Sequence, residues 1–273
     1  MATEAYDKSP VYSKLGPLGR AGLAWECLRR NREYQDAYRS LVNKTDASDE
    51  MEERWGISFP GDPDLPADRA EIFWNYRDSP ATVVLQPAEK DFPGAPRIGG
   101  SGLKLVSSRR GRCYEYLLLE GERDPVAVML RPGVGAATPL AAYIEYDGDY
   151  QTRCRAARDF LRAVSGLGPC ADADDLAVTE RRNVILSLWA ADLRRTGLPH
   201  RKIAMEIFGR ENVPSGAHWR RHRLCGLMFR LIQRGNDLIE GDYRDLLRKR
   251  RRTRRRHTAD AGPSARVRHP ARS

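Results

Sequence analysis

Residues 200–234 have the sequence HRKIAMEIFGRENVPSGAHWRRHRLCGLMFRLIQR, and this stretch decides the fold that we expect. A short helix begins at Pro199, because proline suits the first turn of a helix. Glycines and a proline over residues 209–216 predict a turn. Apolar positions at helical spacing predict a longer basic helix over residues 217–233. These proportions are those of a helix-turn-helix unit, here at about residues 199–234.

The longer predicted helix carries its charge on one side. On a continuous helix with 100° per residue, four arginines fall within an arc of about 80°, beside an apolar face. These arginines are Arg220, Arg223, Arg230 and Arg234. Arginine suits phosphate and guanine because its planar fork donates two parallel hydrogen bonds. The pattern indicates nucleic-acid contact, and a solvated arginine face on an ordinary amphipathic helix is the alternative.

The candidate DNA-binding residues cluster near the starts of the two helices. A helix in the major groove reads bases near one end, so we assign base edges or nearby phosphates to Arg220, Arg221 and Arg223. Arg230 and Arg234 are assigned to the flank, because the stripe rises by about 21 Å from its first to its last arginine. Backbone N–H groups at a helix start also favour phosphate. The candidate phosphate contacts there are Ser215 and His218 in the longer helix and His200, Arg201 and Lys202 in the shorter one.

The charge of the chain is concentrated towards its C-terminus. The net charge is +10, yet residues 1–100 hold 13 basic and 17 acidic side chains, whereas residues 201–273 hold 20 and 7. Eight of the nine residues 248–256 are cationic, which predicts a disordered basic tail over residues 249–273 that attracts phosphate without sequence preference. A tail that only improves solubility is the alternative. A GC-rich genome would explain much of the ratio of 40 Arg to 7 Lys, but not the clustering.

Several classes of protein are excluded or made improbable by what the sequence lacks. No apolar run approaches the ~20 residues of a membrane helix, and the polar N-terminus has no secretory signal. The five cysteines are scattered without a CxxC pair, so we expect neither a zinc ribbon nor disulfides. His218 and His222 have the spacing of a two-histidine metal site, but nothing nearby supplies a further ligand. We therefore expect no enzyme, no cofactor and no metal, and a cytoplasmic, nucleoid-associated location.

The rest of the chain predicts an α+β fold. Apolar periodicity indicates a helical hairpin near the N-terminus, a small central antiparallel sheet, and further helices before the helix-turn-helix-like unit in a C-terminal helical domain. We expect an N-terminal domain at residues 10–80 and a second domain at residues 81–248. The predicted strands are 82–85, 103–106, 114–119 and 126–130, and the predicted helices include 18–30, 31–41, 149–164 and 179–197.

Two stretches of sequence resemble known domains. The segment LGRAGLAWECLRRN at residues 18–31, followed by Tyr34 and Tyr38, resembles the N-terminal transcriptional regulator-like domain, in which a similar tryptophan- and arginine-bearing stretch is typical. Trp55 to Phe59 and Phe73-Trp74 continue this similarity. Leu23 and Cys27 replace aromatic residues that are frequent in the family, and both remain apolar.

The C-terminal part resembles the RovC-like DNA-binding domain family. The similarity is carried by Arg181-Arg182, Arg201-Lys202-Ile203-Ala204, Ile207-Phe208-Gly209, Trp219, Arg223, Arg230-Leu231, Arg234-Gly235 and the segment GDYRDLL at residues 241–247. The family often has Lys-Thr or Lys-Ser after the tryptophan, where this chain has Arg220-Arg221. The resemblance implies a bacterial transcriptional regulator, in some members an activator of secretion genes or of transfer of integrative elements.

We therefore expect a sequence-specific regulator of transcription, an activator, that binds double-stranded DNA with an arginine-rich helix in the major groove. A homo-oligomer is expected because one such helix reads only a few base pairs. RNA polymerase or a regulatory protein is a further expected partner, and no membrane is. Two alternatives stay open. One is a protein-interaction module, an anti-activator or assembly partner; the other is an RNA-binding protein without sequence-specific DNA readout.

Overall fold

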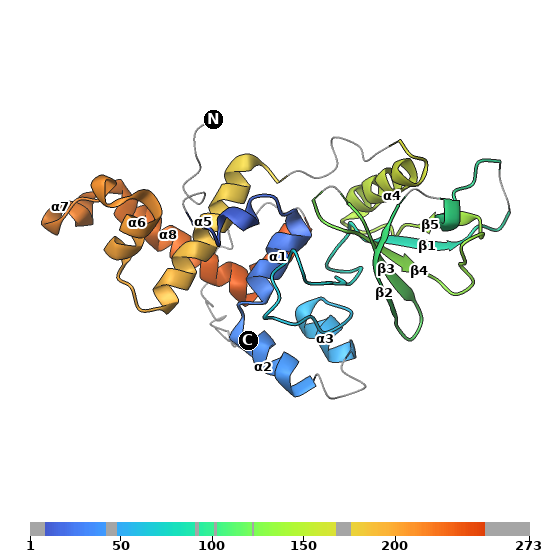
Figure 1. Ribbon diagram of the computed structural model, residues 1–273, viewed down its shortest axis with the longest axis horizontal. Helices are drawn as coiled ribbons and strands as arrows, with labels where there is room; N and C mark the ends of the chain where they lie inside the picture. The colour runs from blue at the N-terminus through green and yellow to red at the C-terminus, as the bar shows by residue number, and fades with distance from the viewer. Residues whose placement is uncertain are drawn as a thin grey trace, which may run out of the picture.

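The structure is a computed structural model that describes residues 9–41, 48–90, 93–100, 103–121, 123–167 and 176–248. A helical part and a sheet-containing part lie side by side along the long axis of the molecule (Figure 1). The expected α+β class is confirmed. The basic tail after residue 248 lies outside the described residues. Within the described ranges, no helix combines the length and the apolar character needed to span a bilayer.

The helical part is assembled from both ends of the chain. The N-terminal end supplies α1 (Arg20–Leu28), α2 (Arg32–Leu41) and α3 (Ser48–Trp55), and the C-terminal end supplies α5 (Val178–Arg195), α6 (His200–Phe208), α7 (Gly216–Arg221), α8 (Arg223–Asp237) and α9 (Tyr243–Leu247). The two helices expected near the N-terminus are present, and α1 packs most extensively on α9. Buried side chains from both ends form one hydrophobic core. The boundary that we expect near residue 80 stays a prediction, and this shared core spans it.

The N-terminus of α1 is capped by a residue from the sheet-containing part. The backbone N–H groups of Gly19, Ala21 and Gly22 donate to the Asp124 carboxylate over 2.9, 2.8 and 3.3 Å. A side chain at position 19 would collide with that carboxylate, so only glycine lets Asp124 approach. The carboxylate thus satisfies helix N–H groups that have no partner within the helix, and it ties the two parts together.

The sheet has five strands in the order β2 (Leu105–Arg110), β3 (Glu115–Leu119), β4 (Val126–Leu130), β1 (Val83–Pro87) and β5 (Leu140–Tyr143). The four expected strands are present, and β5 is additional. The expectation of an antiparallel sheet is wrong in one respect, because β1 pairs with β4 in parallel and the sheet is mixed. The β2–β3 hairpin and the β3–β4 hairpin place β4 in the interior, and β1 docks against its free side.

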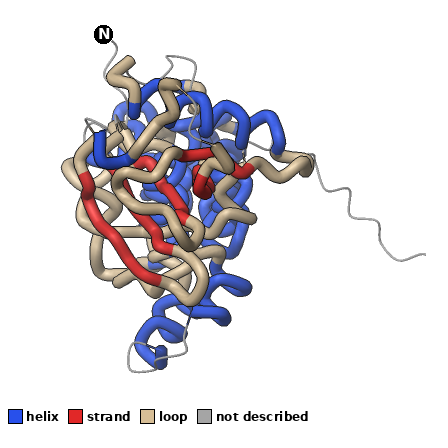
Figure 2. The backbone as a smooth tube through the Cα atoms, turned by 90° about the vertical axis from the view of Figure 1, so that its right-hand side faces the viewer, coloured by secondary structure: helices blue, strands red, loops and turns tan. Residues whose placement is uncertain are grey.

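The central strands β1, β3 and β4 are buried on both faces, whereas most of β2 is exposed. Alternate residues of the strands point to opposite sides, so that Val83 and Leu85 belong to one apolar cluster and Val84 to another. Helix α4 (Tyr150–Val164) covers the first face through Phe160. Aromatic rings from the loop that precedes β1, including that of Phe73, cover the second face. Figure 2 views the molecule from the sheet end, with helices of the other part behind the strands. A strand buried on both faces has a continuous apolar run, as parallel strands do.

Candidate nucleic-acid interface

Three helices support the end of the molecule that is farthest from the sheet. Helices α5, α6 and α8 pack against one another, and α7 lies at the extreme end of the helical part (Figure 1). Most of the apolar residues expected to face inward do so, because Ile203, Ala204 and Ile207 of α6 and Met228 of α8 have no exposed surface. This core holds α7 and the start of α8 on a rigid base. Phe229 was expected on the apolar face of the longer helix but is 56% exposed.

The longer helix expected over residues 217–233 is interrupted, which corrects the single arginine stripe predicted across it. His222 has an extended backbone with φ −78° and ψ 141°, and it separates α7 from α8. Its side chain caps α8, since the imidazole Nδ1 accepts from the Leu224 N–H over 3.4 Å. Trp219 and Leu224 both pack against the helical core. On a continuous helix these two side chains would point about 140° apart, so the break lets both reach the core.

The break redistributes the predicted arginines. Arg220 and Arg221 end α7, whereas Arg223 begins α8 and Arg230 lies two turns later on the same face. All four side chains are exposed. Among the described residues, none of the four is joined to a carboxylate by an ion pair. Arg223 and Arg230 are separated by about 10 Å of rise along the axis of α8.

Some of the other candidate side chains are exposed, and others form hydrogen bonds or ion pairs within the protein. Lys202, Ser215 and His218 are exposed. Arg201 donates through Nε to the Pro214 carbonyl oxygen over 2.8 Å, which holds the turn against α6. Arg234 forms an ion pair with Asp242, with 3.0 Å between Nη1 and Oδ2, so its charge is already compensated.

His200 has a different environment from the other candidates. Its ring lies against that of Phe229, with 4.2 Å between the ring centroids. Burial, together with the positive charge of Arg194, lowers the pKa of the His200 imidazole. The lowered pKa favours the neutral ring at pH 7. His200 can therefore serve as a hydrogen-bonding group at the start of α6, but contributes little positive charge there.

The charge around this end is strongly unequal. Residues 199–234 hold eight arginine or lysine side chains and two acidic ones. The excess ends towards the C-terminus of α8, where Gln233 donates to Asp237 over 2.7 Å and Glu240 is exposed. We call the exposed surface made by Lys202, Ser215, His218, Arg220, Arg221, Arg223 and Arg230 the basic end. The basic end would attract a polyanion, whereas the acidic residues near the C-terminus of α8 would repel it.

Two family models match the chain. The DNA-binding domain of a T6SS transcription factor matches residues 138–248, and a proteobacterial transcriptional regulator-like domain matches residues 7–60. The protein is a DNA-binding transcriptional regulator. Both domains named from the sequence, the RovC-like one included, are thereby confirmed. A search of curated proteins and a search of solved structures each returned no match.

The matched DNA-binding region of the regulator includes all the candidate residues and the whole basic end. It also includes two features that sequence reasoning missed, the cap made by His222 and the break that follows from it. Histidine is an uncommon N-cap, so the sequence carried little signal for this position. On a continuous helix with 100° per residue, Arg221 would fall within the apolar face. That conflict was the available hint, and the break resolves it.

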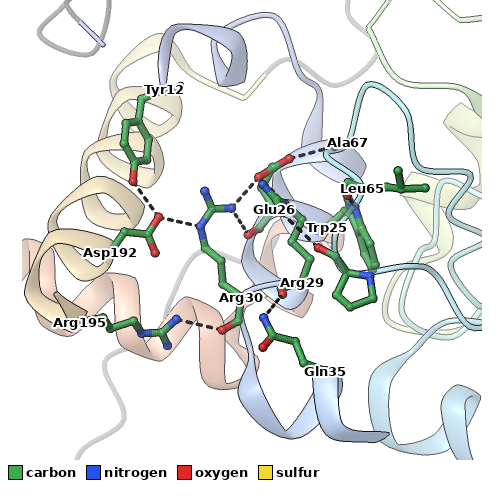
Figure 3. Close-up of polar contacts among 11 residues, drawn as sticks. Tyr12, Trp25, Glu26, Arg29, Arg30, Gln35, Leu65, Ala67, Asp192 and Arg195 are labelled. Atoms are coloured by element: carbon green, nitrogen blue, oxygen red, sulfur yellow. Dashed lines mark hydrogen bonds and ion pairs between the residues drawn. The ribbon is translucent and has the colours of Figure 1, made fainter. Parts of the chain in front are cut away.

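A second group of arginines joins the two matched domains of the regulator (Figure 3). Arg30, in the turn that follows α1, reaches Glu26 of α1 over 2.6 Å and Asp192 of α5 over 2.8 Å. The Tyr12 hydroxyl donates to the same Asp192 carboxylate over 2.8 Å, and the Ala67 N–H donates to Glu26 over 2.9 Å. We call these five residues the interdomain network. It fixes α1 against the helix that supports the basic end.

The interdomain network is largely removed from water. Glu26 is 1% exposed and the Arg30 side chain 12% exposed. Burial raises the pKa of the Glu26 carboxyl, but Arg30, Arg29 and the Ala67 N–H outweigh it, and the net pKa lies below the ordinary value. Glu26 is therefore ionised at neutral pH, and Arg29 and Arg30 form ion pairs with it.

Proposed function

We propose that the regulator recognises a specific sequence in double-stranded DNA by placing the first two turns of α8 in the major groove. Arg223 and Arg230 would reach base edges or adjacent phosphates from α8. Arg220 and Arg221 would hold the neighbouring backbone from α7. The observation that carries this proposal is the set of four exposed arginines without carboxylate partners in the described chain, inside the matched DNA-binding domain.

The remaining candidate residues would position the protein on the duplex. Lys202 on α6 and Ser215 and His218 at the start of α7 are exposed, and phosphate contacts there would set the register of the groove-bound helix. His200 and Arg201 would orient α6 through Phe229 and Pro214. Arg234 would remain a flanking residue, because Asp242 already compensates its charge.

The regulatory outcome that we propose is activation of transcription, in line with the family resemblance. A homo-oligomer would bind paired half-sites, because the basic end of one chain covers only a few base pairs. RNA polymerase or a regulatory protein would be the further partner. Binding to DNA would place the regulator at the nucleoid.

Selection of random DNA duplexes by the purified full-length regulator near physiological salt, followed by sequencing, tests this function. We expect an enriched motif, with two half-sites if the protein binds as a dimer. The same selection with the Arg223→Ala variant should lose the enrichment. Duplex binding without any enriched motif would contradict sequence-specific readout and favour an RNA or an acidic protein as the partner.

A further inference from the structure

Helix α8 contains two glycines, and only one of them is explained by packing within the chain. Gly235 is buried where α8 crosses α5, and a side chain there would collide with the Ser187 carbonyl and lie 2.7 Å from the Ala191 methyl group. The close contact between these two helices therefore requires glycine at position 235. Sequence similarity to the DNA-binding domain family includes this position, as part of Arg234-Gly235.

Gly226 has no comparable reason within the described chain. It is exposed on α8, and the nearest atom to a side chain placed there would be Nη1 of Arg230 at 3.9 Å. Its backbone is helical, so no turn or left-handed conformation requires glycine. Glycine is among the least favourable residues in a helix interior. The helix therefore accepts a local loss of stability that no intramolecular contact offsets.

The position of Gly226 relates it to the basic end. Arg223 precedes it by three residues and Arg230 follows it by four, so all three lie on one face of α8. Both arginines are exposed. Two cationic side chains thus flank a place where the backbone of the helix is bare. Because Gly226 has no side chain, another molecule can come close to the backbone of α8 at this point without any depression in the protein surface.

We propose that Gly226 is the point at which α8 comes closest to DNA, and that the absence of a side chain lets the helix backbone approach the groove. This inference deepens the proposed function and rests on it. Arg223 and Arg230 would then reach the walls of the groove on either side of the contact. The acidic residues beyond Gln233, namely Asp237 and Glu240, would mark where the helix leaves the duplex.

The test uses three variants of the full-length regulator and the duplex most enriched in the selection. Gly226→Ala should raise Tm by about 2–4 °C, because alanine favours the helix. The same variant should weaken binding about fivefold or more, and Gly226→Leu should weaken it further, as overpacked contacts do. Gln233→Leu places the same leucine side chain at an exposed position of α8 two turns later and should leave the affinity unchanged. Arg223→Ala reports separately on the proposed function.

The outcomes separate the two proposals. Normal affinity of Gly226→Leu together with weakened binding by Arg223→Ala would overturn the role of Gly226 and leave the proposed function standing. An equal loss in Gly226→Leu and Gln233→Leu would also overturn it, because the closest approach would not be at Gly226. Normal affinity in both Gly226→Leu and Arg223→Ala would overturn the inference and the proposed function together. Circular dichroism of each variant confirms that the helices have formed.

Discussion

The interdomain network and the basic end both depend on arginine, but the arginines have opposite surroundings. Arg30 lies between Glu26 and Asp192 and is almost removed from water. Arg220, Arg221, Arg223 and Arg230 are exposed, without carboxylate partners among the residues described. An arginine that forms an ion pair with a carboxylate of the same chain stabilises the fold, whereas an exposed arginine without such a pair is available to bind phosphate. Amino-acid composition does not distinguish the two groups of arginines. They differ in whether each guanidinium has a carboxylate partner in the folded protein.

The largest expected effect comes from breaking the interdomain network. Arg30→Met keeps most of the side-chain length but removes the charge, so Glu26 and Asp192 lose their shared partner. Removing one member of a buried ion pair costs about 3–5 kcal/mol. Urea unfolding at pH 7 should therefore show a strongly lowered midpoint.

Arg39→Met provides the matched control, since Arg39 pairs with Asp36 on the exposed side of α2, where both side chains are largely in water. Surface ion pairs contribute about 0–1 kcal/mol. Equal midpoints for Arg30→Met and Arg39→Met would mean that the interdomain network contributes nothing special to stability.

The basic end should respond in the opposite way. Arg223→Ala or Arg220→Ala should weaken specific DNA binding by about 1–3 kcal/mol, while the free energy of unfolding changes by less than about 0.5 kcal/mol. Fluorescence anisotropy with the enriched duplex measures the first quantity, and urea unfolding the second. A variant that loses both stability and binding would show that its arginine supports the fold.

Acid should weaken the interdomain network. The pKa of Glu26 is lower in the folded protein than its ordinary value, so its charge stabilises the fold at neutral pH. That contribution is lost as the pH falls from the ordinary glutamate pKa of about 4.3 through the lower folded value. Unfolding midpoints measured between pH 6 and pH 3 should fall less steeply for Glu26→Gln than for the unmodified protein. Parallel curves would contradict the role given to Glu26.

The smallest effect is expected at Arg234, which lies in the DNA-binding region but holds Asp242. Arg234→Gln should cost about 0–1 kcal/mol of stability, as half-exposed ion pairs do, and should change DNA affinity by less than about twofold. The anisotropy assay used for Arg223→Ala measures it. An effect on affinity as large as that of Arg223→Ala would move Arg234 into the DNA-contacting group.

Much of the local structure could be predicted because it depends on neighbours in sequence. Pro199 and the spacing of Ile203 and Ile207 predict α6, and the structure begins that helix at His200. The apolar run from Val126 to Leu130 predicts β4. The two domain similarities were likewise carried by short stretches, and both family matches agree with them.

The interruption at His222 could not be predicted from the periodicity of the helix alone. The arginine stripe assumed a continuous helix, but Trp219 and Leu224 both have to reach one core. The core against which both side chains pack is formed in part by α5 and α6, which precede the break at His222 in the sequence. The stripe was therefore correct for Arg223 and Arg230 on α8, and wrong in placing Arg220 on the same helix.

The sequence by itself determined most of the helices and strands, where the positive charge is concentrated, and which domain families the chain resembles. Tertiary structure alone decided that β1 lies parallel to β4, that α1 packs on α9, and which arginines meet a carboxylate. The physical reason is range. Periodicity and capping act over a few residues, whereas strand pairing, shared burial and ion pairing depend on which distant residues the folded chain brings together.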